Sequence, residues 1–164
     1  MFFFSTGQVP TADDFLPVAR YKQVDETAPV SSATVQDDDE LVIPGVVPGR
    51  YALLAWIAYS SASSTPDIRH DFFAPAGTTM ERTTFAQGTG ASATSGSIHT
   101  ETAVNPGTDV LRGTLAGNTL SMLIVGGMTV STAGTVGFRW GQGTSDSNSV
   151  TVRAGSWLWL ARLA

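Results

Sequence analysis

Few residues of this chain are of a type that could do chemistry, and the first group lies in one short stretch. Asp67, His70 and Asp71 supply two carboxylates and an imidazole, which are side chains that bind divalent metals. Neighbouring residues of a strand point to opposite faces, so Asp67 and His70, three positions apart, cannot share one. We therefore predict a polar strand edge at this stretch and no metal site.

Two further groups have charge or ligand character. His99 and Glu101 lie two residues apart on a predicted strand and share a face, but no third ligand or nucleophile accompanies them, which favours a surface pair. The run Asp37-Asp-Asp-Glu40 could attract calcium. An EF-hand loop, however, spreads its ligands over alternate positions around a glycine turn that is missing here. The acidic run is therefore interpreted as a solvated turn before a strand.

Sequence motifs of nucleophilic and nucleotide chemistry are missing. The chain has no Gly-x-Ser-x-Gly elbow, no Gly-x-x-x-x-Gly-Lys loop and no cysteine. The acids of residues 41–164 are too scattered to nominate a catalytic pair. They are Asp67, Asp71, Glu81, Glu101, Asp109 and Asp146. We predict that the protein is not an enzyme and that it uses no cofactor and no metal.

Charge is distributed unevenly over the 164 residues. Residues 1–40 hold eight acids against Arg20 and Lys22, a net charge of −6, whereas residues 41–164 hold six acids and seven bases, a net charge of +1. The two parts sum to the formal charge of −5. Because Lys22 is the only lysine, no basic stripe for phosphates can form, and no nucleic-acid partner is expected. The apolar run that starts at Tyr51 is far shorter than the roughly 20 residues of a membrane-spanning helix, so no membrane contact is expected.

The elements that hold these residues are predicted to be β-strands, because Gly, Ser and Thr abound, strong helix formers are scarce and proline recurs. Residues 51–59 are apolar on both alternating faces, which is typical of a strand buried on both sides. One face carries Tyr51, Leu53, Ile57 and Tyr59, and the other carries Leu54 and Trp56. Further strands are predicted at 40–43, 68–73, 79–85, 97–103, 110–115, 120–125, 136–140, 149–153 and 156–161.

A jelly roll of two packed antiparallel sheets accommodates this many short strands. We predict an all-β, antiparallel jelly-roll β-sandwich at residues 34–164, preceded by an extended N-terminal arm at residues 1–33. Its expected core consists of Leu53, Trp56, Ile57, Phe73, Leu123, Val125, Phe138, Trp140, Trp157 and Leu160.

A strand that is apolar on both faces carries more large side chains than one small core needs. Part of this surface is therefore expected to meet a neighbouring copy of the chain. The expected subunit interface is the face with Tyr51, Leu53, Ile57 and Tyr59. The tryptophans and tyrosines could also stack on sugars in a receptor-binding groove. Their positions on predicted strands favour packing in the core and at an interface.

Three stretches of the chain resemble a family of short virion proteins of tailed bacteriophages, chiefly those that infect actinobacteria. The first runs from Tyr21 to Leu41 and continues in the aromatic-rich strand at 51–59. The second, residues 67–77, ends in Ala-Pro-Ala-Gly, and the third, residues 132–158, resembles two closing strands joined by a Thr-Ser-Asp turn. The likeness covers residues 21–164, with 86–118 poorly matched. Gly141 stands where related chains commonly have Ala.

The resemblance implies a trimeric β domain similar to the tumour-necrosis-factor-like jelly roll. It also implies a virion structural protein, expected to be a capsid decoration protein on the outer surface of the head, with the major capsid protein as its partner. The alternative within the same family is a minor tail or head-fibre tip protein that binds a host-surface glycan or protein. The small size and the lack of a fibrous shaft favour decoration.

Residues 1–30 combine bulky apolar side chains with three prolines, which is typical of an extended segment that orders on a partner. We expect this arm to dock on the capsid. Its docking residues are expected to be Phe2, Phe3, Phe4, Phe15 and Leu16. The alternative is that Phe2, Phe3 and Phe4 cover one end of the β domain.

Overall fold

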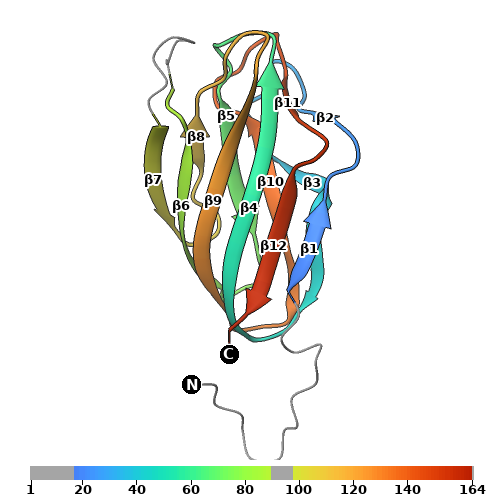
Figure 1. Cartoon of the computed structure of the whole chain (residues 1–164), viewed down its shortest axis with the longest axis vertical. Coiled ribbons are helices and arrows are strands. Elements are labelled where there is room, and N and C mark those ends of the chain that lie inside the picture. The colour runs from blue at the N-terminus through green and yellow to red at the C-terminus, as the bar shows by residue number, and fades with distance from the viewer. Residues whose placement is uncertain (1–16, 90–97, 164) are drawn as a thin grey trace, which may run out of the picture.

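The computed structural model describes residues 17–89 and 98–163, and all regular elements within these ranges are β-strands (Figure 1). Their bounds are β1 Val18–Tyr21, β2 Glu26–Thr27, β3 Gln36–Val46, β4 Gly49–Ser61, β5 Ile68–Phe73, β6 Thr79–Gln87, β7 Ile98–Val104, β8 Val110–Arg112, β9 Thr119–Val130, β10 Gly134–Gln142, β11 Val150–Val152 and β12 Trp157–Arg162. The described ranges contain no helix with the length and apolar character needed to cross a membrane.

Two sheets pack face to face, and their strands pair in antiparallel fashion. The larger sheet has the order β1-β12-β4-β9-β6-β7, with β11 paired to β4 and β2 paired to β11. The smaller sheet has the order β3-β10-β5-β8. In Figure 1 the larger sheet lies in front of the smaller one. The predicted all-β antiparallel sandwich is confirmed, and the arrangement is jelly-roll-like.

The core fills the space between the two sheets. Along β4, every second side chain from Tyr51 to Tyr59 points inward and is at most 7% exposed, as the alternation of a strand requires. Phe72 and Phe138 of the smaller sheet meet edge to face, with ring centroids 5.6 Å apart. The other large buried side chains include Leu41, Ile43, Ile68, Met122, Ile124, Trp140, Leu158 and Leu160.

Two short strands extend the sandwich into the predicted arm. β1 pairs with β12, and β2 pairs with β11, so both short strands belong to the larger sheet. The sandwich therefore starts before the expected boundary at residue 34. The physical reason is that the edges of β12 and β11 carry backbone groups that need hydrogen-bond partners, and this segment supplies them.

The predicted core is only half correct. Leu53, Ile57, Phe138, Trp140 and Leu160 are buried as expected. Trp56, Leu123, Val125 and Trp157 instead point away from the smaller sheet, because the inward side of β4 carries Leu53 and Ile57. Phe73 lies on the outside of the smaller sheet over Gly137, where a Cβ atom would come within 2.3 Å of its ring.

Candidate functional site

A row of aromatic side chains crosses the outer face of the larger sheet. In register, Tyr21 lies opposite Trp157, Trp157 opposite Trp56, Trp56 opposite Leu123, and Leu123 opposite Phe85. Residues directly opposite each other on paired strands point to the same side of a sheet. Five strands thus place these side chains in one line on one surface. Tyr21 is 60% exposed, Trp56 is 40% exposed and Phe85 is 37% exposed.

A second row runs beside the first on the same side of the sheet. It passes from Ala19 to Trp159, Leu54, Val125 and Thr83. We call the two rows together the aromatic face. Its residues are Ala19, Tyr21, Leu54, Trp56, Thr83, Phe85, Leu123, Val125, Trp157 and Trp159. None of these ten side chains is charged.

The outside of the smaller sheet has a different character. There Arg139 forms an ion pair with Asp37 at 3.2 Å, and Arg69 forms one with Asp109 at 3.5 Å. An outer sheet face in contact with water is normally polar in this way. The aromatic face departs from that rule, because its mostly apolar side chains are exposed or half-buried.

The predicted interface residues lie on the other side of the same strand. Tyr51, Leu53, Ile57 and Tyr59 point into the core of a single copy, and the last two are fully buried. The Tyr59 hydroxyl donates to the Gly113 carbonyl at 3.0 Å, and burial raises its pKa. These four side chains are therefore not available to a neighbouring copy, and the predicted interface is wrong. Both faces of β4 are apolar, so its own pattern did not identify the inward one.

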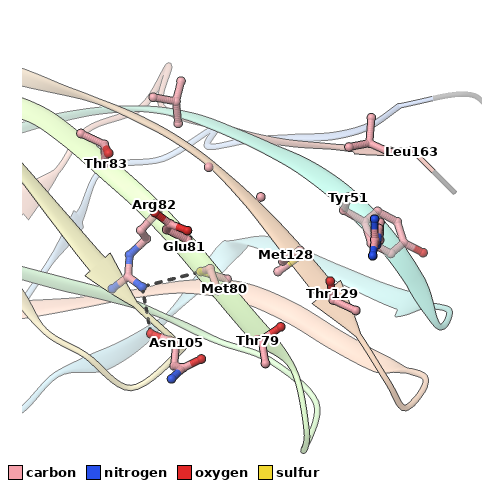
Figure 2. A pocket seen from close by; sticks show the side chains of 14 residues that line it. Tyr51, Thr79, Met80, Glu81, Arg82, Thr83, Asn105, Met128, Thr129 and Leu163 are labelled. Atoms are coloured by element: carbon pink, nitrogen blue, oxygen red, sulfur yellow. Dashed lines mark hydrogen bonds between the residues drawn. The ribbon is translucent and has the colours of Figure 1, made fainter.

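A hollow of about 650 Å³ adjoins the aromatic face at the end of the sheet where β4 begins (Figure 2). Gly127 of β9 has no side chain and lies opposite Glu81 of β6, which leaves a bare strip of backbone. Exposed Arg50 and Leu163 border the strip together with Thr79 and Thr129, among other lining residues. The arrangement can receive a protruding side chain of a partner molecule and brings no catalytic pair together.

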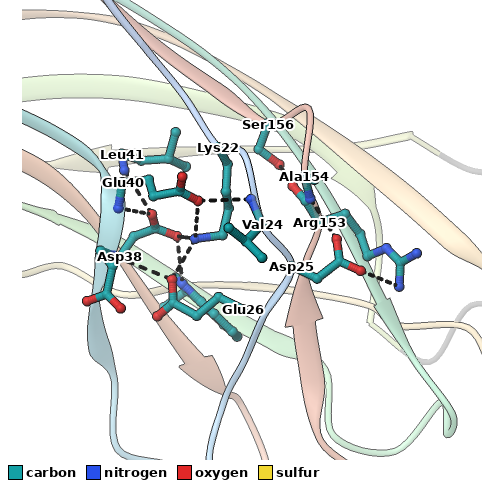
Figure 3. A network of polar contacts seen from close by, with 12 residues as sticks. Lys22, Val24, Asp25, Glu26, Asp38, Glu40, Leu41, Arg153, Ala154 and Ser156 are labelled. Atoms are coloured by element: carbon teal, nitrogen blue, oxygen red, sulfur yellow. Dashed lines mark hydrogen bonds and ion pairs between the residues drawn. The ribbon is translucent and has the colours of Figure 1, made fainter.

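Lys22 lies at the centre of a buried ionic cluster (Figure 3). Its Nζ atom lies 2.5 Å from Glu26, 2.8 Å from Asp38 and 3.8 Å from Glu40, and its side chain is 1% exposed. The Trp140 Nε1–H also donates to Asp38, at 3.2 Å. Burial alone would lower the pKa of the Lys22 amine, but the hydrogen bonds to Asp38 and Glu26 outweigh it and raise the pKa.

The cluster gives a structural role to the acidic run at residues 37–40, which we predicted to form a solvated turn. Residues 37–40 lie inside β3, not in a solvated turn before it. Asp38 and Glu40 bind Lys22, and Glu40 also accepts hydrogen bonds from the backbone N–H groups of Gln23 and Val24. Two of the four acids therefore hold the segment after β1 against the smaller sheet. Sequence reasoning missed this role because it compared the acids with calcium loops and not with the lysine 16 residues before Asp38.

The other candidate ligands are not assembled into a metal site. His70 and Asp71 are buried, so the predicted polar strand edge is wrong at these two positions. Asp71 binds the Arg82 guanidinium at 2.7 Å, and Asp67 lies in the loop before β5. Among the described residues, no group of three or more His, Asp or Glu side chains could hold a metal ion.

Two sets of predicted residues are not described at the level of side chains. His99 and Glu101 lie opposite Ala86 and Thr84 in the pairing of β7 with β6. The predicted docking residues Phe2, Phe3, Phe4, Phe15 and Leu16 lie outside the described residues.

Comparisons with known proteins give no family. No family model and no curated protein matches the chain. Among solved structures, the chain is similar to one in the structure of infectious bursal disease virus Gx strain, with 12% sequence identity and a TM-score of 0.20. The match covers 98% of this chain and 44% of the viral chain, so this chain spans less than half of that length. At this TM-score the likeness carries no functional argument.

Proposed function

We propose that this protein is a bacteriophage virion structural protein, a homotrimer that decorates the outer surface of the capsid. The virion role rests on the sequence resemblance of residues 21–164. The observation that supports self-association is the aromatic face, an exposed apolar surface on an otherwise complete sandwich. Cores of protein interfaces are rich in aromatic residues and poor in charge, as this face is.

Copies of the same chain are the partners that best suit the aromatic face. Each copy carries a formal charge of −5, so association of copies through a charged surface would bring like charges together. An uncharged face avoids this repulsion. The acidic side chains Asp37 and Asp109 lie in ion pairs with Arg139 and Arg69 of the smaller sheet. The number of copies, three, follows from the resemblance.

Attachment to the capsid is assigned to residues 1–16. The register of β1 with β12 places Val18 opposite Leu160, so residue 17 leaves the sandwich at the end where β12 finishes. Three arms in a trimer would bind three equivalent capsid sites at once. Such multivalent attachment raises the overall affinity by about 10²–10⁴-fold when the geometry lets all arms bind together.

The alternative function is a tail or head-fibre tip that binds a host-surface glycan. One observation favours it: Trp56 and Tyr21 present exposed rings in one row, and aromatic rings can stack on sugar faces. The two functions differ in what covers the rings. Self-association buries them in solution, whereas glycan binding needs them open.

Substitution of the aromatic face tests this proposal. Trp56→Asp places a carboxylate in the middle of the interface and is expected to give a folded monomer, because burying an unpaired charge is strongly unfavourable. Leu111→Asp is the matched control, since Leu111 is 39% exposed, close to the 40% of Trp56, but lies on β8 of the smaller sheet. The masses are measured by analytical ultracentrifugation, and the fold is checked by circular dichroism. A wild-type chain that is monomeric at micromolar concentration would overturn the self-association.

Removal of the arm tests the attachment. A chain without residues 2–16 keeps β1 and the Lys22 cluster, so it is expected to fold and associate as the full chain does. It is expected to be lost from purified particles, with copy number counted by quantitative mass spectrometry against the major capsid protein. Hundreds of full-length copies per particle support decoration, and a handful supports the tail. Unchanged incorporation of the shortened chain contradicts docking through the arm.

A further inference from the structure

A buried histidine lies between the two sheets, in the part of the core near β6 and β8. His70 of β5 is fully buried, and its ring stacks on Phe138 with centroids 5.9 Å apart and an interplanar angle of 25°. Within the described part of the chain, neither Nδ1 nor Nε2 has a hydrogen-bond partner. A neutral imidazole usually uses one nitrogen as a donor and the other as an acceptor. His70 is therefore held by packing alone.

The charged groups around His70 are mainly cationic. Arg82 reaches it from β6 and Arg112 from β8, and both side chains are buried. Arg82 binds Asp71 at 2.7 Å and the Thr108 carbonyl at 2.6 Å, while Arg112 donates to the Thr84 carbonyl at 3.2 Å.

Other titratable groups lie on the elements that surround His70. Tyr59 of β4 donates to the Gly113 carbonyl, and Asp67 precedes β5. On the far side, Trp140 of β10 donates to Asp38 of β3, which also binds Lys22. Arg139 of β10 pairs with Asp37. Within the described residues no carboxylate forms a hydrogen bond with the His70 ring, so a proton there would lack a stabilising acceptor.

Protonation of His70 is therefore incompatible with its place in the fold. Burial lowers its pKa well below 6.5, and the Arg82 and Arg112 charges lower it further. In an opened or unfolded chain the imidazole regains a pKa near 6.5. Below about pH 6.5 the open form takes up a proton that the closed form does not. The closed form thus loses stability as the pH falls through this range and is unaffected above it.

We propose that His70 makes the contact of β5 and β8 with β6 sensitive to acid. When the pH falls, this part of the sandwich opens while the rest stays closed. β8 has three residues and pairs with β5 only from Ile68 to His70. The segment around it is held to the larger sheet by the side-chain hydrogen bonds of Arg82 to the Asn105 and Thr108 carbonyls and by a backbone bond from the Gly113 N–H to the Gln87 carbonyl. β4 and β9, in contrast, pair along nearly their full lengths. Acid is expected to open β5 and β8 first and to leave the β4–β9 ladder closed.

One buried and one half-buried carboxyl titrate in the opposite direction. Burial raises the pKa of Asp71 and of Asp67, so a falling pH stabilises the closed form through them. Variants at His70 separate its effect from theirs. His70→Phe keeps a stacked ring, and His70→Gln keeps a polar side chain, but neither titrates. The matched control is His99→Gln, which removes the only other histidine of the chain.

Hydrogen exchange measured by mass spectrometry tests the proposal. It is measured at pH 7.5 and 5.5, and the exchange times are corrected for the pH dependence of the intrinsic amide exchange rate. In the wild-type chain and in His99→Gln, the opening constant of amides in β5 and β8 is expected to rise by up to about tenfold per pH unit below 6.5. In His70→Phe and His70→Gln this rise is expected to disappear. If the Phe variant does not fold, the Gln variant decides. An acid response that persists without His70, or one that is equal in β9, overturns the proposal.

Discussion

Lys22 shows how one residue can organise a whole edge of the molecule. It is the chain's only lysine, and three carboxylates from β2 and β3 surround its amine. The segment that carries Lys22 belongs to the larger sheet, whereas Asp38 belongs to the smaller one, so the ion cluster closes the sandwich along this side. The sequence contained all of these residues, but a long-range pair of this kind has no local signal. Its existence depends on β1 pairing with β12.

Removal of the Lys22 charge is expected to destabilise the fold. Lys22→Met leaves Asp38 buried without its cation, and breaking a buried pair in this way costs about 3–5 kcal/mol. The control is Arg153→Gln, which breaks an ion pair with Asp25 whose side chains are 44% and 41% exposed. Exposed pairs contribute about 0–1 kcal/mol. Both values are measured by urea unfolding, and equal losses in the two variants would contradict a special role for Lys22.

At the scale of elements, the sequence predicted the strands well and their environment less well. All ten predicted segments contain strands, because apolar alternation and Gly or Pro turns are local signals. β1 and β2 were missed because they have only four and two residues and form by pairing with β12 and β11. The inward face of β4 could not be chosen, because it depends on which side the smaller sheet covers.

Two adjacent glycines of β9 offer a test of how closely the strands approach. A Cβ atom on Gly126 would lie 2.4 Å from the Glu81 carbonyl oxygen of β6, whereas one on Gly127 would meet only the Tyr51 carbonyl oxygen, at 3.7 Å. Gly126→Ala is therefore expected to lower the unfolding free energy by about 1–3 kcal/mol through overpacking. Gly127→Ala is expected to be nearly neutral. Thermal and chemical unfolding measure the difference, and equal effects would mean that β6 yields to the added methyl group.

On the scale of the whole molecule, the two outer faces differ in chemistry. The smaller sheet presents ion pairs, and the larger sheet presents the aromatic face. The prediction that β4 supplies more apolar surface than one core needs named its inward side, whereas the exposed side chain Trp56 lies on the other side of the strand. Sequence alone could indicate a surplus of apolar residues. Only the register across five strands shows that this surplus forms one continuous surface.

Association through this face is expected to withstand salt. Its residues are uncharged, whereas the copies that it joins carry charges of the same sign. Salt therefore screens the repulsion between the copies and weakens no attraction within the contact. Raising the NaCl concentration from about 0.05 M to about 0.5 M, where the Debye length shrinks severalfold, should leave the dissociation constant unchanged or lower it. Sedimentation equilibrium measures this constant. Dissociation at high salt would instead point to charged contacts between the copies.

The placement of the four tryptophans gives the protein an optical readout of its own state. Three of them, Trp56, Trp157 and Trp159, lie on the aromatic face, while Trp140 is fully buried beside Asp38. Covering the face would remove water from the exposed parts of these three indole rings and leave the surroundings of Trp140 unchanged. The emission wavelength of the unlabelled chain therefore reports assembly, and it does so from the same side chains that make the contact.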